Sequence, residues 1–286
     1  MHHKPNTNIT LDEKACNELI ELRLLQEAIF LKYGYDFRDY HKSHFRRRVQ
    51  SIMVMEAIPS IHDLQYHIIY ETEIFHRLLK DLSINVTEMF RDPEFYVYMR
   101  KEIVPVLKTY PFLKVWHAGC STGEEVFSMC MLFKEEGLYD KTQFYATDFN
   151  HEVLTKAMEG IYPLANIKSY TENYIRAGGI KPFSEYYITD PISAQFDKSL
   201  LKNVVFSDHN LVSDNVFSEM NLIICRNVLI YFNKTLKARV FQLFSDSLIR
   251  GGYLCLGTKE NYLDIRAEKD YELIQPGLKV FRKHYK

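Results

Sequence analysis

The sequence predicts a small all-helical domain over residues 1–82, followed by an α/β domain over residues 83–286. Apolar residues recur at helical spacing through the first domain. In the second domain, short apolar runs alternate with helical segments, which is typical of a mostly parallel sheet with helices on both faces. The chain of 286 residues is also long enough for about two domains of roughly 150 residues each.

Four helices are predicted in the first domain. The first begins at Thr10, whose hydroxyl can cap it, and ends at Gly34. The second carries Arg38, Lys42 and Arg46 at four-residue steps, which puts them on one face. Two shorter helices are expected over residues 61–70 and 72–80.

The second domain is predicted to contain six strands with helices between them. A helix over residues 92–108 leads into the first strand, and the segment 161–203 is expected to be an irregular inserted subdomain. Because parallel strands end at the same edge of a sheet, a ligand is expected at their carboxyl ends. The strands are expected over residues 113–118, 142–147, 204–207, 221–225, 253–257 and 278–282, and further helices over residues 150–158 and 234–249.

Composition excludes several classes of protein. The 36 basic and 37 acidic residues leave a formal charge of −1, which argues against nucleic-acid binding by bulk charge. The sequence has no apolar run of about 18 residues and no secretory leader, so we expect no membrane insertion. The five cysteines lie mostly in apolar runs, and no histidine pair has a cysteine at metal-ligand spacing. We therefore expect a cytoplasmic monomer with reduced thiols and no metal.

A glycine-containing turn, residues 119–123, joins the first strand of the α/β domain to the following helix. Backbone at such a turn can approach a ligand closely, with Gly119 in contact, although a purely structural turn is an alternative. Glu124 and Glu125 follow directly, and Ser121 replaces the middle glycine of a dinucleotide fingerprint. Two carboxylates would repel a pyrophosphate, so the pattern favours a cationic nucleoside, S-adenosylmethionine, over NAD or FAD.

Two further strand ends carry polar residues. Asp148 ends the second strand, where its carboxylate can accept hydrogen bonds from both ribose hydroxyls; a helix cap is the alternative. Arg226 and Asn227 follow another buried strand, and a buried arginine is costly unless it is paired, so a structural salt bridge is also open. Tyr231 lies just beyond, either facing the ligand or packed in the core.

Five motifs are spread in order along nearly the whole chain: Asn85–Arg91 (NVTEMFR), Cys120–Glu125 (CSTGEE), Ala146–Asp148 (ATD), His209–Leu211 (HNL) and Cys225–Phe232 (CRNVLIYF). Together they resemble the CheR chemotaxis receptor methyltransferases. The resemblance implies a Rossmann-like S-adenosylmethionine-dependent methyltransferase domain behind the helical domain. It also implies methyl transfer to glutamate carboxylates of chemoreceptors, with S-adenosylhomocysteine as the product.

The resemblance implies roles for particular residues. Arg91 and Tyr231 would border the transferred methyl group and act in catalysis, while Asp148 would hold the ribose and Glu125 would lie near the methionine part. The family usually has a different triplet where this chain has Thr258–Glu260, which leaves the role of that loop open. The implied cofactor contacts are Asn85, Thr87, Arg91, Glu125, Asp148, Asn210, Leu211, Arg226 and Asn227.

The helical domain carries a basic segment that could dock a partner. Residues 38–48 hold five basic side chains against Asp39, a local charge of about +4. The resemblance implies that glutamate-rich receptor helices bind there, and an ordinary solvated helix face is the alternative. The five basic residues are Arg38, Lys42, Arg46, Arg47 and Arg48.

Two other functions stay open at this point. The same cofactor could serve a different protein or a small-molecule acceptor, or the chain could be a non-catalytic scaffold that binds the cofactor.

Overall fold

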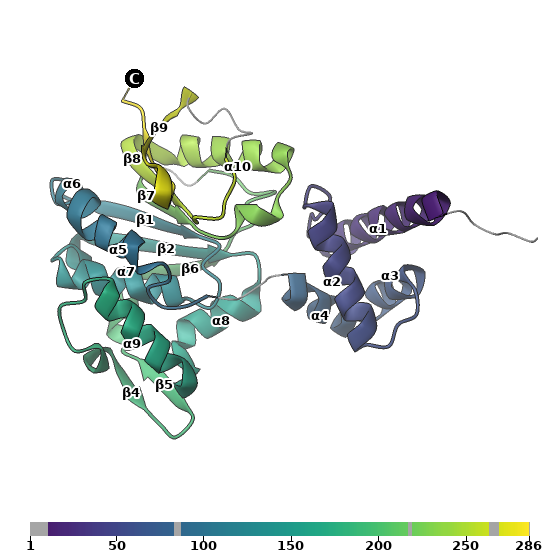
Figure 1. The fold of residues 1–286 in the computed structure, drawn as a ribbon, viewed down its shortest axis with the longest axis horizontal. Helices are drawn as coiled ribbons and strands as arrows, with labels where there is room; N and C mark the ends of the chain where they lie inside the picture. Colours follow the sequence, from purple (N-terminus) through teal and green to yellow (C-terminus); the bar gives the residue numbers. More distant parts are fainter. Residues whose placement is uncertain (1–10, 83–86, 217–218, 263–268, 286) are drawn as a thin grey trace, which may run out of the picture. The chain divides into compact units, whose positions relative to one another are not determined.

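A computed structural model describes residues 11–82, 87–216, 219–262 and 269–285. The chain divides into two compact units, Met1–Ile84 and Asn85–Lys286 (Figure 1). Within the described ranges, no helix combines the length and the apolar character needed to cross a membrane.

Over residues 11–82, the first unit consists of four helices around an apolar core that includes Leu25, Phe45 and Phe75. The first helix ends before Gly34, whose φ of +78° is a left-handed conformation that glycine adopts freely. The third helix begins after Ser60, whose hydroxyl accepts a hydrogen bond from the Asp63 amide. The helices are α1 Leu11–Tyr33, α2 Lys42–Met55, α3 Ile61–Tyr70 and α4 Thr72–Leu82.

The predicted start of the second helix is wrong, because Arg38 precedes the helix instead of lying on it. Asp36 holds Arg38 in the preceding turn by accepting from its Nε at 2.9 Å and from its Nη2 at 2.8 Å. Phe37 and Tyr40 are buried and pack edge to face, which fixes this turn and delays the helix to Lys42. Thr10, the predicted cap of the first helix, lies outside the described residues.

The second unit is built on a seven-stranded sheet with the order β6-β2-β1-β7-β8-β10-β9. The first five strands in that order are parallel, and β10 runs antiparallel to both of its neighbours. From β1 the chain adds β2 and then β6 on one side, and it returns to the other side of β1 as β7. The strand order therefore reverses between β1 and β7, and α/β sheets bind ligands at such a switch point. The strands are β1 Leu113–Ala118, β2 Thr142–Asp148, β6 Val204–Asp208, β7 Met220–Cys225, β8 Leu248–Leu256, β9 Tyr271–Gln275 and β10 Val280–Lys283.

Helices cover both faces of this sheet, with α7 on one side and α10 on the other (Figure 1). Trp116 of β1 packs edge to face on Phe244 of α10, while its neighbour Val115 joins the core cluster that contains α7. Successive side chains along β1 thus pack on opposite faces of the sheet. The helices are α5 Pro93–Tyr98, α6 Val104–Leu107, α7 Glu124–Glu135, α8 His151–Glu159 and α10 Lys234–Ser247.

The predicted helix over residues 92–108 is divided into three parts. A π-helical turn, Met99–Ile103, lies between α5 and α6. Pro105 has no N–H to donate to the carbonyl of Lys101, four residues earlier, which accounts for the local change of register.

The prediction that the segment 161–203 is irregular is wrong. The segment forms a small antiparallel sheet and a helix. The strands contain only three or four residues each, too few to show an alternating pattern in the sequence. The elements are β3 Ile161–Pro163, α9 Ile167–Arg176, β4 Tyr187–Thr189 and β5 Ser193–Phe196, with sheet order β3-β5-β4.

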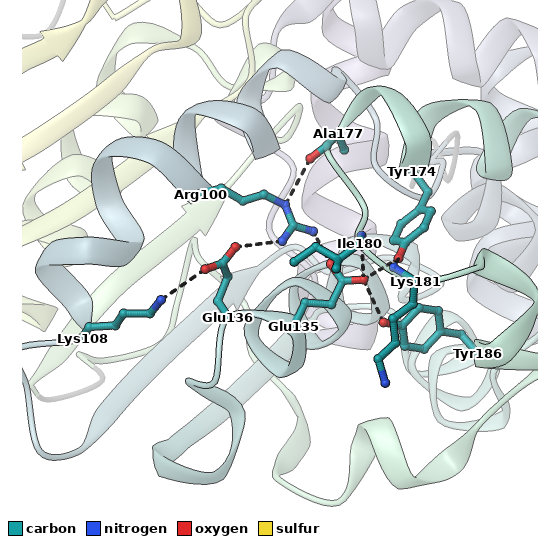
Figure 2. A network of polar contacts seen from close by, with 9 residues as sticks. All are labelled: Arg100, Lys108, Glu135, Glu136, Tyr174, Ala177, Ile180, Lys181 and Tyr186. Carbon is teal, nitrogen blue, oxygen red and sulfur yellow. Dashed lines mark hydrogen bonds and ion pairs between the residues drawn. The ribbon is translucent and has the colours of Figure 1, made fainter.

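A buried carboxylate fastens this inserted segment to the main sheet domain (Figure 2). Glu135, at the end of α7, accepts hydrogen bonds from the hydroxyls of Tyr174 and Tyr186 and from the Ile180 amide, and it pairs with Arg100. Only 1% of the Glu135 side chain is exposed, so each of these donors offsets the cost of burying the charge. The chain between α9 and β4 is thereby anchored to α7.

Candidate functional site

Three loops with polar residues leave the sheet at one edge. Because β2, β1 and β7 are adjacent and parallel, Asp148, Gly119 and Arg226 emerge side by side at their carboxyl ends. The structure therefore brings together the three strand ends that the sequence analysis singled out.

Four backbone amides of the glycine turn are already used within the protein. The amides of Gly119 and Cys120 donate to the Thr147 carbonyl at 2.8 and 2.9 Å. The Ser121 amide donates to Asp148 Oδ2 at 3.0 Å, and the Gly123 amide donates to the Cys120 carbonyl. These donors are not left to cradle a diphosphate, which supports a nucleoside without phosphates.

Glycine is required at this turn because neighbouring segments approach it closely. Gly119 has φ of +79°, and a Cβ there would lie 2.5 Å from Cγ2 of Val228 in the loop after β7. Gly123 has φ of +91°, and a Cβ there would lie 2.8 Å from that of Ala157 in α8. A side chain at either position would therefore collide with the neighbouring segment.

Acidic side chains gather around the turn. Burial raises the pKa of Asp148 to about 6, although amide hydrogen bonds from Asn150 and Ser121 oppose the rise. Burial also raises the pKa of Glu124 to about 7, against hydrogen bonds from Thr122 and Tyr170. Such a group of carboxyls suits a ligand that carries positive charge, as S-adenosylmethionine does at its sulfonium and amino groups.

Arg226 is the centre of a buried ionic network. Its Nη1 lies 3.3 Å from Glu125 Oε2, and its Nη2 lies 2.5 Å from Asp92 Oδ2. Nη2 also donates to the Arg91 carbonyl at 3.1 Å, and the guanidinium stacks over the Phe95 ring. Only 3% of the Arg226 side chain is exposed. The structural salt bridge considered for Arg226 is present, and it also ties the segment that carries Arg91 to the end of β7.

Glu125 is the second charged group in this network. Burial alone would raise its pKa, but hydrogen bonding from His117 and the charge of Arg226 outweigh that effect and lower the pKa. Its carboxylate therefore remains ionised beside the glycine turn at neutral pH.

The loop after β7 is held in place by Glu260. One oxygen of the Glu260 carboxylate accepts from the amides of Val228 at 2.9 Å and Leu229 at 2.8 Å, and the other accepts from the Gly257 amide. Asn227 takes a left-handed φ of +64° in this loop, and Tyr231 lies half-buried in the short helical turn that follows. The Thr258–Glu260 loop, whose role the sequence left open, thus supports the residues that follow β7.

The remaining predicted cofactor contacts lie in two other segments. Asn210 and Leu211 follow β6, where Asn210 Oδ1 accepts from the Val212 amide at 3.0 Å and Leu211 is buried. Thr87 is half-buried in the segment that leads to Arg91, and Asn85 lies outside the described residues.

The inserted segment contributes supporting residues that the sequence analysis missed. The Tyr162 hydroxyl donates to the Thr122 carbonyl at 2.8 Å, and Tyr170 donates to Glu124 Oε1 at 3.3 Å. Asn173 donates to the Met89 carbonyl, next to the Arg91 segment. Two further residues were missed: His117, which contacts Glu125, and Asp92, which contacts Arg226. The position of Asp92 next to Arg91 in the sequence was the one signal that pointed to it.

Comparison with known families covers almost the whole chain. The model described as the CheR methyltransferase SAM-binding domain matches residues 85–275, and the model described as the CheR methyltransferase all-alpha domain matches residues 20–83.

Individual relatives agree with these matches. A Pseudomonas putida protein named Cher3, with a provisional assignment as a methyltransferase, is 47% identical over 93% of this chain and 98% of its own length. Chemotaxis protein methyltransferases of Listeria innocua and Borreliella burgdorferi are 28% and 27% identical over 81% and 95% of this chain, covering 86% and 94% of those proteins. The family resemblance, the fold class and the cofactor predicted from the sequence are thus confirmed, and the chain belongs to the CheR family of S-adenosylmethionine-dependent methyltransferases.

Proposed function

We propose that this chain transfers the methyl group of S-adenosylmethionine to glutamate side chains of chemoreceptors. The products are glutamate methyl esters and S-adenosylhomocysteine. Family membership supports the methyl transfer, and the chemotaxis relatives support a receptor as the acceptor.

The reaction needs no general base. A glutamate carboxylate has an ordinary pKa near 4.3, so at neutral pH it already carries the attacking electron pair. The cofactor supplies an electrophilic methyl group; a carboxylate oxygen bonds to the methyl carbon as the carbon–sulfur bond breaks, and no proton moves. The task of the protein is therefore orientation, which can lower such a barrier by about 7–11 kcal/mol.

The observation that carries the proposal is the attachment of Arg91 to the cofactor edge of the sheet. Arg226 bonds both the Arg91 carbonyl and the neighbouring Asp92 carboxylate, while the Glu260 carboxylate supports the loop that leads to Tyr231. We infer that the Arg91 guanidinium orients the incoming carboxylate and that the Tyr231 hydroxyl donates a hydrogen bond to it.

Removing either orienting group is expected to slow methyl transfer at saturating substrate. Arg91→Ala should lower kcat by about 100-fold and Tyr231→Phe by about tenfold, because the carboxylate then samples unproductive angles. Tyr66→Phe, at an exposed position of the first unit, is the matched control and should leave kcat unchanged. Near-normal kcat in both site variants would show that these residues do not orient the acceptor.

The decisive assay is transfer of labelled methyl groups to membranes that contain the cognate receptors, followed by treatment with alkali. Methyl esters release methanol under base, whereas N-methyl groups do not. An alkali-stable label would indicate a different acceptor. Cofactor binding without any transfer would indicate a scaffold.

The basic segment of the first unit is largely neutralised by neighbouring acids. Arg38 pairs with Asp36 and Glu27, Arg46 pairs with Glu18, and Arg48 pairs with Asp81. These surface pairs reduce the field that a partner would experience.

Two basic residues of that segment keep an uncompensated charge. Lys42 and Arg47 are exposed and make no ion pair with any described residue. We therefore propose that Lys42 and Arg47 contribute most to docking of an acidic receptor helix.

Charge reversal at these two positions is expected to weaken receptor methylation. Lys42→Glu combined with Arg47→Glu should lower kcat/KM for the receptor about tenfold at low salt, and added salt should reduce the difference. Lys156→Glu combined with Lys168→Glu makes the same change of net charge at exposed positions of the second unit and should have little effect. Equal losses in the two double variants, or a rate of the unmodified chain that salt does not change, would contradict docking at this segment.

A further inference from the structure

His117 is a buried titratable residue that the proposed chemistry does not use. It lies on β1, and its side chain is fully buried. Its Nδ1 is 3.1 Å from Oε1 of Glu125, in the first turn of α7. A buried imidazole is costly without a hydrogen bond, so this contact needs a physical account.

The contact determines which ring nitrogen of His117 donates a hydrogen bond. A carboxylate is an acceptor only, so His117 Nδ1 must carry the hydrogen. The other ring nitrogen, Nε2, is buried and has no hydrogen-bond partner among the described residues. The hydrogen bond from Nδ1 therefore fixes which edge of the ring faces the Glu125 carboxylate.

With Nδ1 of His117 as a donor, the two oxygens of Glu125 have different partners. Oε1 receives the His117 hydrogen bond, and Oε2 faces Arg226 Nη1 at 3.3 Å. Arginine favours a bidentate pairing, in which two of its N–H groups donate to the two oxygens of one carboxylate. Without the hydrogen bond from His117, Glu125 would be free to turn both oxygens towards Arg226 and away from the glycine turn.

We propose that His117 is a positioning residue that holds the Glu125 carboxylate in the direction needed to bind the amino group of the cofactor's methionine part. The inference rests on the proposed place of Glu125 beside that part of the cofactor. The amino group is common to S-adenosylmethionine and S-adenosylhomocysteine. Loss of His117 should therefore weaken both ligands equally and leave the methyl-transfer step unchanged.

Two amide variants separate this role from simple packing. In His117→Asn the amide nitrogen can take the place of Nδ1, whereas in His117→Gln it takes the place of Nε2. Calorimetric titration with S-adenosylhomocysteine should show about tenfold weaker binding by the Gln variant and rescue towards the unmodified affinity by the Asn variant. At saturating S-adenosylmethionine, kcat of the Gln variant should match that of the unmodified chain.

Thermal unfolding without ligand and a double variant complete the test. The Asn side chain is smaller and leaves a larger cavity, so the Asn variant should be no more stable than the Gln variant although it binds the cofactor more tightly. Adding His117→Gln to Glu125→Gln should cause no further loss of affinity. Equal affinities of the Asn and Gln variants, or additive losses in the double variant, would overturn the inference. Because the readout is cofactor binding, failure to methylate a receptor would count against the proposed acceptor alone.

Discussion

Asp148→Asn is expected to weaken S-adenosylmethionine binding by about 100-fold. We propose that the Asp148 carboxylate accepts hydrogen bonds from both ribose hydroxyls, whereas the amide has no charge and only one acceptor oxygen. The asparagine would also disturb the protein itself. Asp148 Oδ2 accepts from the Ser121 amide and Oδ1 from the Asn150 amide, and an Asn side chain can accept at only one of these positions. Equilibrium titration with the cofactor measures the loss.

Asp208→Asn is the matched control, since Asp208 is an exposed carboxylate paired in register with Asp148 on the adjacent strand β6. It should bind the cofactor nearly as well as the unmodified chain. Equal affinities of the two variants would show that Asp148 does not hold the ribose.

The proposed role of Asp148 also predicts that cofactor affinity depends on pH. Burial raises its pKa to about 6, and the ionised form is the better acceptor, so cofactor affinity should fall as pH drops through about 6. Glu124 titrates nearby with a pKa of about 7, so the difference between the unmodified chain and Asp148→Asn isolates the contribution of Asp148. That difference should shrink at low pH.

Arg226→Met is expected to cost about 3–5 kcal/mol of folding free energy and to abolish methyl transfer. The substitution leaves the carboxylates of Glu125 and Asp92 without their shared cation, and it releases the Arg91 carbonyl. Urea unfolding measures the stability loss, and labelled methyl transfer at a temperature where the variant is folded measures the activity.

Two controls test the origin of these losses. Arg226→Lys keeps the charge but lacks the planar fork, so it should recover part of the stability and little of the activity. Arg250→Met removes an exposed arginine and should change neither property by much. A fully active Arg226→Met variant would show that the network does not position Arg91.

The parts of the fold that the sequence predicts are those with strong local signals. Apolar strands such as β1 and β7 alternate with long helices, and their polar ends pointed to the correct edge of the sheet. The elements that were missed lack such signals. The strands of the inserted segment are too short for periodicity, and β9 carries no buried side chain after its first residue.

The site was predictable only where a single residue type is unusual in its surroundings. Arg226 interrupts an apolar run and Asp148 ends a strand, so both could be noticed without knowledge of their partners. The contacts that hold them cannot be read in the same way. Arg226 is separated from Asp92 by 134 positions and from Glu125 by 101, and no local pattern links residues so distant along the chain.

The Tyr162 hydroxyl donates to the glycine turn and the Tyr170 hydroxyl to Glu124, so residues 161–203 cannot be removed without loss of support for the site. Phe127 of α7 also packs against Tyr162 and Phe196, so excision of this stretch would expose an aromatic surface to water. A shortened chain would therefore need other donors in place of the two hydroxyls, and other apolar side chains against Phe127, before it could bind the cofactor.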